Sequence, residues 1–283
     1  MERAVTVSLI AHRCRTSDRT PLAALGVETL APLFGKRLGR EPREIGTPGH
    51  ARIGDWREDL VESRGCLLEA GGQVEDALTG GNAPVLLSAE CTIGLTTLPA
   101  VMRVRPDARV LWLDAHGDFN TPETSPSGYL GGMALAGACG VWEAGLGDSI
   151  DPARVVLAGV RDLDDREREL LEDNPVTVIG ASLETLVYTQ NALDRSPVYL
   201  HVDLDVIDPE SFPAQFPAPG GLAPDKVYDL LEAVSGECEV LGFEVTAFEA
   251  PEDELERQDA ASTALRVLEP LVDAVQRGAR VSG

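Results

Sequence analysis

Residues 111–120 have the sequence LWLDAHGDFN, in which an apolar run ends in two acids and a histidine. Alternate side chains of an extended backbone leave on the same side, so we expect Asp114, His116 and Asp118 to point into one small volume. Clustered acids repel one another and lose hydration on burial, and a divalent cation offsets both costs. The stretch therefore predicts a metal site at the end of a strand.

Strands and helices alternate on both sides of this stretch. Apolar and β-branched runs predict strands at residues 4–10, 85–88, 108–113, 155–160, 176–179, 198–202 and 239–245. Helical spacing predicts helices at residues 21–38, 58–78, 93–104, 133–140, 165–172, 183–191, 224–234 and 262–276. This alternation predicts an α/β fold with a parallel sheet covered by helices on both faces. Because no repeat or linker interrupts it, we expect one catalytic domain over residues 1–283.

The composition of the chain argues against two classes of partner. A formal net charge of −23 over 283 residues leaves no basic stripe for a nucleic-acid backbone. No apolar run is long enough to span a membrane, and the first residues lack the features of a signal peptide. We therefore expect a cytoplasmic protein that binds neither nucleic acid nor a membrane.

The five cysteines are an odd number without pair spacing. Because the sequence has no secretion signal, we expect four of them to be small buried hydrophobic residues, namely Cys14, Cys66, Cys139 and Cys238. Cys91 is different because it lies directly after a predicted strand, where parallel sheets carry their functional residues.

A second pair of acids repeats the pattern of the first motif. Asp203 and Asp205 follow the strand at residues 198–202 and should share one face of the chain. His201 lies on the same face, where it is either an interior histidine or a residue that orients a ligand. Four carboxylates with one imidazole suit Mn²⁺ better than Zn²⁺. Two metals about 3.5–4 Å apart would use all of these ligands. The alternative for any single acid is a helix cap or a turn.

The blocks DAHGD at residues 114–118, NTP at 120–122, SG at 127–128 and DLDVIDP at 203–209 resemble the signatures of the ureohydrolases, the arginase and agmatinase family. The resemblance runs in order from about residue 85 to residue 251. It implies a three-layer α/β/α fold with a parallel sheet of about eight strands. It also implies two Mn²⁺ ions per chain and hydrolysis of a guanidine-type C–N bond by a hydroxide that bridges them.

Carried over by position, the resemblance assigns roles to the residues of these blocks. The implied metal ligands are Asp114, His116, Asp118, Asp203 and Asp205, and Asp118 also has the catalytic role of accepting a proton or hydrogen bond from the hydroxide. The residues implied to bind substrate are Asn120, Ser125 and Ser127 at its carboxylate and Asp164 at its α-amino group. Keeping both sets favours a small-molecule guanidino amino acid over a decarboxylated amine, although hydroxyl groups in loops also serve as caps.

Three positions depart from the family pattern. Cys91 stands where the family has a ligand histidine; it either coordinates a metal or is a buried thiol beside a lost metal site. Gly131 replaces a histidine that assists proton transfer in arginases. Ala247 replaces the glutamate that holds the guanidinium, and Glu249 could substitute for it if the backbone bulges, the alternative being a surface acid.

These departures resemble the branch of the family that acts on N-hydroxyarginine. We therefore expect an amidinohydrolase that acts on arginine or N-hydroxyarginine. The alternatives are a ureohydrolase of another guanidino or formimino acid, and a catalytically silent relative that binds a metal or a ligand. The resemblance also implies a homo-oligomer, although no segment marks an interface.

Overall fold

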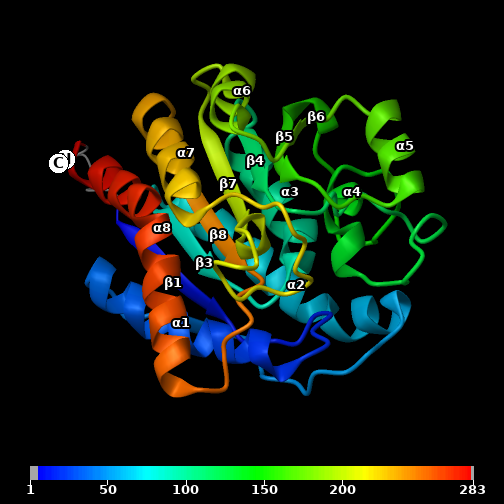
Figure 1. The fold of residues 1–283 in the computed structure, drawn as a ribbon, viewed down its shortest axis with the longest axis horizontal. Coiled ribbons are helices and arrows are strands. Elements are labelled where there is room, and N and C mark those ends of the chain that lie inside the picture. The colour runs from blue at the N-terminus through cyan, green and yellow to red at the C-terminus, as the bar shows by residue number, and fades with distance from the viewer. Residues whose placement is uncertain (1–5, 282–283) are drawn as a thin grey trace.

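A computed structural model describes residues 6–281 and contains one eight-stranded parallel sheet (Figure 1). The order of its strands is β2-β1-β3-β8-β7-β4-β5-β6. The strands are β1 (Val7–His12), β2 (Arg43–Ile45), β3 (Ala83–Leu87), β4 (Arg109–Leu113), β5 (Val155–Val160), β6 (Thr177–Gly180), β7 (Val198–Asp203) and β8 (Val240–Thr246). Every residue of β3, β5 and β7 is buried, as expected for strands covered on both faces.

Helices cover both faces of the sheet and make a three-layer α/β/α structure (Figure 1). One apolar core lies between the sheet and α1 (Pro21–Leu38), α6 (Thr185–Leu193), α7 (Pro224–Glu237) and α8 (Glu254–Val281). The second core lies between the sheet and α2 (Trp56–Thr79), α3 (Gly94–Val104), α4 (Ala134–Ala138) and α5 (Asp165–Asp173). Short 3₁₀ turns lie at η1 (Cys91–Ile93), η2 (Gly131–Met133), η3 (Pro152–Arg154) and η4 (Leu204–Val206). The predicted α/β fold is therefore confirmed.

Local sequence explains where several helices begin and end. Pro21 occupies the first turn of α1, and Gly39 ends that helix in the left-handed conformation, with φ of 66°. Asp55 caps α2 by accepting a hydrogen bond from the backbone N–H of Arg57.

The structure differs from the prediction at both ends of the chain. Strand β2 is absent from the prediction, since this three-residue edge strand buries only Ile45. Helix α8 begins eight residues before the predicted helix, because its first two turns are mostly exposed and lack an apolar stripe. The predicted first strand starts at residue 4, and residues 4–5 lie outside the described part of the chain.

The expectation that four cysteines are merely buried hydrophobic residues is wrong for two of them. Cys14, which follows β1, and Cys66, in α2, form a disulfide with a Cα–Cα distance of 6.3 Å. The two residues are 52 positions apart, so their proximity arises from the packing of α2 near β1 and not from sequence spacing. Cys139 is a buried free thiol, as predicted, whereas Cys238 is half-buried.

The topology brings the predicted site residues to one edge of the sheet. Strands β3, β8, β7 and β4 are consecutive neighbours, and all of them run in the same direction. The segments that follow their carboxyl ends contain Cys91, Ala247, Asp205 and Asp114, respectively. Parallel sheets carry ligand sites at this edge. Among residues 6–281, no helix is both long and apolar enough to cross a membrane.

Candidate metal centre and substrate pocket

Two aspartates turn the chain directly after their strands. Strand β4 ends at Leu113, and Asp114 Oδ1 accepts a hydrogen bond of 2.7 Å from the backbone N–H of His116. Asp203 Oδ1 accepts a similar bond of 2.8 Å from the backbone N–H of Asp205. The backbone is therefore not extended through residues 114–118, in contrast to the geometry expected from the sequence. The side chains still converge because each first aspartate caps the turn that presents the next ligand candidate.

The first group of potential ligands consists of Asp114, His116 and Asp205, which we call the imidazole group. Their ligand atoms all lie within 4.8 Å of one another. His116 Nδ1 is 2.8 Å from Asp205 Oδ2 and 3.4 Å from Asp114 Oδ1. Asp205 Oδ1 also accepts a hydrogen bond from the backbone N–H of Ala115. Residues that follow two neighbouring strands thus form a set of oxygen and nitrogen donors.

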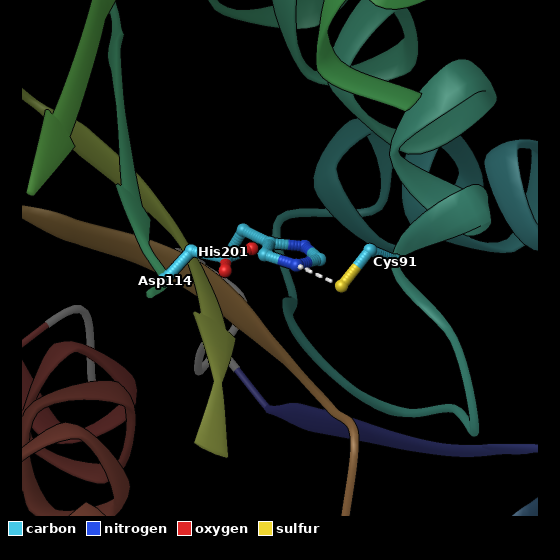
Figure 2. A group of neighbouring side chains, drawn as sticks. All are labelled: Cys91, Asp114 and His201. Atoms are coloured by element: carbon cyan, nitrogen blue, oxygen red, sulfur yellow. Dashed lines mark hydrogen bonds between the residues drawn. The ribbon is translucent and has the colours of Figure 1, made fainter. Parts of the chain in front are cut away.

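The second group consists of Cys91, Asp114 and His201, which we call the sulfur group (Figure 2). All three residues are buried, and their ligand atoms also lie within 4.8 Å of one another. The Cys91 thiol donates a hydrogen bond of 2.8 Å to Asp203 Oδ2. His201 Nε2 lies 3.3 Å from Cys91 Sγ, the contact drawn as a dashed line in Figure 2. Cys91 therefore lies among the predicted ligands and not in a separate apolar pocket.

Groups on the central strands hold His201 in place. Its ring stacks on the ring of Trp112, with centroids 3.5 Å apart, and its Nδ1 lies 2.7 Å from Glu244 Oε1. The Tyr199 hydroxyl donates a hydrogen bond of 2.9 Å to Glu244 Oε2. Trp112, His201 and Glu244 are register partners across β4, β7 and β8. The sulfur group is therefore supported by a row of side chains built into the sheet.

Electrostatics in the chain alone favour a cation at this place. Burial and the charges of Asp205 and Asp114 raise the pKa of Asp203 well above its usual value. Burial and the charge of Asp114 do the same to the pKa of Asp118. Burial alone would lower the pKa of His116, but hydrogen bonds to Asp114 and Asp205 raise it to about 12. Without a metal, protons would have to neutralise these acids, so the donor set fits divalent cations.

Asp118 connects two cavities that lie at the centre. The inner cavity, which we call the chamber, has a volume of about 20 Å³. The outer cavity, which we call the vestibule, has a volume of about 240 Å³. Four of the residues that the structure describes line both of these cavities, namely His116, Asp118, Tyr129 and Phe216. Asp118 reaches this position through a left-handed backbone conformation with φ of 47°.

The vestibule brings together four of the five residues predicted to bind substrate. Asn120, Ser125, Ser127 and Asp164 line it, and Asn120 Nδ2 donates a hydrogen bond of 3.0 Å to Asp164 Oδ2. The sequence prediction missed Arg19, which also lines this cavity and places its guanidinium 4.4 Å from the centroid of the Tyr129 ring. No short motif marks Arg19, since it lies in a loop far from the other residues in sequence.

Glu249, the fifth predicted substrate residue, lies elsewhere. Its Oε1 accepts a hydrogen bond of 2.9 Å from the Thr20 hydroxyl, and it lines neither the chamber nor the vestibule. Ala247 lines the chamber instead, with a positive φ of 60°. The structure therefore does not bring Glu249 to the other predicted site residues.

Tyr129 explains why position 131 carries glycine. A Cβ atom on Gly131 would lie 2.5 Å from Cε1 of Tyr129, closer than side-chain carbons approach one another. The Tyr129 hydroxyl donates a hydrogen bond to Glu90 Oε2. Burial and the charge of Asp18 raise the pKa of Glu90 well above its usual value, although Tyr129 and Gln215 oppose that shift. Tyr129 thus fills the space that a side chain at position 131 would need.

Comparison with known proteins agrees with this geometry. Residues 41–272 match the arginase family. The chain belongs to the arginase family. It is 37% identical over 268 residues to N(omega)-hydroxy-L-arginine amidinohydrolase of Streptomyces lavendulae. The aligned region covers 95% of this chain and 98% of that protein. As a member of the arginase family, the chain is a ureohydrolase, and the predicted enzyme class is confirmed.

Solved structures of arginases share the fold. The native arginase of Bacillus caldovelox superimposes with a TM-score of 0.78 at 26% identity, covering 95% of this chain and 98% of that one. An arginase of Entamoeba histolytica in complex with L-ornithine superimposes with a TM-score of 0.82 at 23% identity, covering 96% and 99%. The arginase-like fold expected from the sequence is therefore confirmed.

Proposed function

We propose that this arginase-family enzyme hydrolyses Nω-hydroxy-L-arginine to L-ornithine and hydroxyurea. The observation that carries the proposal is the 37% identity over 95% of the chain to the amidinohydrolase named for that substrate. In the balanced reaction, water adds its oxygen to the guanidine carbon, the bond from that carbon to Nδ breaks, and Nδ takes a proton. The departures at Cys91 and Gly131 further support a substrate other than that of ordinary arginases.

The charges around the vestibule fit the amino-acid end of this substrate. Arg19, Ser125 and Ser127 all line the vestibule, and these groups would hold a carboxylate. Asp162, Asp164 and Glu167 also line the vestibule and would attract an α-amino group. A decarboxylated amine would offer Arg19 no carboxylate. We therefore assign the vestibule to an α-amino acid.

We assign the metal centre to two Mn²⁺ ions per chain, held by Cys91, Asp114, His116, Asp118, Asp203 and Asp205. Carboxylates and one imidazole favour Mn²⁺, whereas the Cys91 sulfur is a softer donor that would suit one of the two positions less well. When bound, such a pair of metals acidifies a water molecule and stabilises the negative charge that develops during hydrolysis. The buried acids fit this role because they need positive charge to remain ionised.

The chain's own residues would orient the substrate and move the protons. Asp118 lies between the vestibule and the chamber, so its carboxylate can accept a proton from the attacking water and return it to the departing Nδ. Asn120, held by Asp164, would fix the amino-acid end at a constant distance from that carboxylate. Tyr129 and Phe216 separate the two cavities and would limit access of bulk water.

Ornithine release from a panel of substrates tests this proposal. Protein loaded with Mn²⁺ should release ornithine and hydroxyurea from Nω-hydroxy-L-arginine faster than it releases ornithine from L-arginine, and it should not act on agmatine. Two metals per chain should be found by mass spectrometry. Release from L-arginine alone, or from neither amino acid, would contradict the proposal.

Two of the earlier expectations, a cytoplasmic location and a homo-oligomer, stay predictions, and light scattering would test the second.

A further inference from the structure

We propose that Glu90 and Gln215 bind the hydroxyguanidine head of the substrate, with Glu90 accepting from its N–H groups and Gln215 donating to its hydroxyl oxygen. This inference rests on the proposed function, and it goes beyond it by naming the groups that distinguish a hydroxyguanidine from a guanidine. It also supplies a replacement for the glutamate that is missing at Ala247. The two residues come from segments that are far apart in sequence.

Glu90 presents a free acceptor to the chamber. The residue is 3% exposed and lines this cavity, directly before Cys91. Its Oε2 accepts the hydrogen bond from the Tyr129 hydroxyl, whereas its Oε1 is buried without a hydrogen-bond partner. A buried carboxyl oxygen without a partner is costly, and a guanidine N–H would relieve that cost. Glu90 can therefore bind the substrate in place of the glutamate missing at Ala247, whose backbone N–H donates a hydrogen bond to the carbonyl oxygen of Ala89, next to Glu90.

Gln215 presents a donor to the same cavity. It is 4% exposed and lines the chamber beside Glu90, where its side chain opposes the increase that burial causes in the pKa of that carboxyl. Its buried Nε2, however, makes no hydrogen bond of good geometry. Its backbone N–H donates a hydrogen bond of 3.0 Å to the carbonyl oxygen of Ala247, and the neighbouring Ala214 pairs with Phe248. These contacts fix the segment that carries Gln215 over the end of β8. The backbone that carries the amide is therefore held in place before a ligand arrives.

The pair of groups matches the chemistry of an N-hydroxyguanidine. A guanidinium carries only N–H donors, so it can bond to Glu90 but offers no acceptor to the Nε2 donor of Gln215. Hydroxylation adds an oxygen that accepts a hydrogen bond, and this oxygen would satisfy Gln215 Nε2. A site built to bond a substrate hydroxyl discriminates strongly against the analogue that lacks it, because the buried polar group then stays unpaired.

Tyr129 makes this arrangement possible. It occupies the space of a side chain at position 131, since a Cβ there would lie 2.5 Å from its ring. Its hydroxyl holds Glu90, and its ring contacts Phe216 with centroids 5.0 Å apart. Tyr129 thus both excludes a side chain at position 131 and holds Glu90 in the chamber. Tyr129 is a positioning residue in this account, because it acts through Glu90.

Substrate preference measures the proposed contacts. We expect Gln215→Leu to lower kcat/KM for Nω-hydroxy-L-arginine by about tenfold or more, the range for a lost hydrogen bond to a buried group, while kcat/KM for L-arginine stays constant. Glu90→Gln should lower kcat/KM for both substrates. Gln258→Leu on α8 and Glu232→Gln on α7 change exposed residues and serve as matched controls.

A binding measurement keeps the test independent of turnover. Free N-hydroxyguanidine should raise the unfolding temperature of the metal-loaded wild-type protein more than guanidine does, and Gln215→Glu, which keeps the shape of the side chain, should abolish the difference. An unchanged substrate preference in Gln215→Leu would overturn the inference, as would a wild-type protein that binds both compounds equally. A larger loss in Glu249→Gln than in Glu90→Gln would overturn it too. Failure of the proposed function has a different signature, namely no ornithine from Nω-hydroxy-L-arginine.

Discussion

The two ligand groups of the candidate centre share Asp114 and each contain a histidine, but they differ in exposure and in their remaining donor. The imidazole group takes His116 and Asp205 from turns after β4 and β7, and His116 lines the vestibule. The sulfur group takes Cys91 and His201, both buried, and the second of these is part of β7 itself. One group is therefore open to substrate and made of hard donors, whereas the other is enclosed by the sheet and contains a soft sulfur.

The two groups also differ in how closely their residues resemble the family blocks. Asp114, His116 and Asp205 all match the family blocks by position. Cys91 departs from them, and it is surrounded by Thr246, His201 and Asp203 within hydrogen-bonding distance. A thiol is smaller than an imidazole, and these three neighbours hold the Cys91 sulfur in place by hydrogen bonds. We therefore expect substitutions in the two groups to have different consequences.

Asp114→Asn should have the largest effect, because it removes the ligand that both groups share. We expect kcat/KM to fall by about 10³-fold, since paired metals supply several kcal/mol of transition-state stabilisation and about 1.4 kcal/mol corresponds to a factor of ten. The metal content should fall in parallel. Asp229→Asn is the control, because this exposed residue of α7 only pairs with Lys226 at 3.0 Å. Retention of two metals and full activity would show that Asp114 is not a shared ligand.

Cys91→Ser and His116→Gln should separate the two groups. Each should weaken one metal position and leave the other intact, with a loss of more than about 100-fold in metal affinity, because removing a direct ligand costs more than removing a group that only orients one. Protein loaded with Co²⁺ provides the readout, because sulfur-to-cobalt charge transfer absorbs in the near ultraviolet. Cys91→Ser should lose this absorption and His116→Gln should keep it. If the wild-type protein lacks the band, Cys91 is a buried thiol and not a ligand.

His201→Gln should have a smaller effect of about tenfold on metal affinity, at the lower end of the range for outer partners of a ligand. His201 contacts the sulfur through Nε2 and Glu244 through Nδ1, so its removal frees Cys91 on one side. The effect should therefore vanish in a Cys91→Ser background, as a double-mutant cycle would show. His50→Gln changes an exposed loop histidine and is the matched control. Equal losses in both backgrounds would mean that His201 only stabilises the fold.

The fold and the imidazole group could be predicted from sequence because both depend on local patterns. Alternating apolar runs and helical stripes indicated the parallel sheet, and its topology then placed residues 114–118 beside residues 203–205. The turns at Asp114 and Asp203 were not foreseen as such, yet the spacing of two residues still brought the side chains together. The edge strand β2 was missed because three residues with one buried side chain carry no periodic signal.

The surroundings of the sulfur group and the chamber could not be predicted, since they depend on contacts between distant segments. Gln215 follows no motif, and its role depends on a loop that packs over β8. Tyr129 could be identified as the occupant of the space at Gly131 only from coordinates. The disulfide between Cys14 and Cys66 likewise joins residues with no characteristic spacing. Glycine at position 131 was the available signal, because it leaves space for a side chain from another position.

Thr246→Val should have the smallest effect on the centre and gives the finest test of the comparison. Thr246 Oγ1 lies 3.2 Å from Cys91 Sγ and 3.3 Å from His201 Nε2, at the end of β8. Valine keeps the shape and removes one hydroxyl, so we expect a loss of about two- to tenfold in metal affinity, the value of one neutral hydrogen bond.

Thr189→Val on α6 is the matched control for that hydroxyl, because Thr189 is fully buried and its Oγ1 has no hydrogen-bond partner. It should leave metal affinity unchanged and should not destabilise the fold, since it removes an unsatisfied polar atom. Thr246→Val should also shift the cobalt–sulfur absorption, whereas His116→Gln should not. The effect of Thr246→Val is to be compared at both metal positions. If it shifts the absorption but leaves the metal affinity of the imidazole group unchanged, the sheet sets the properties of the sulfur group and the turns that face the substrate set those of the imidazole group.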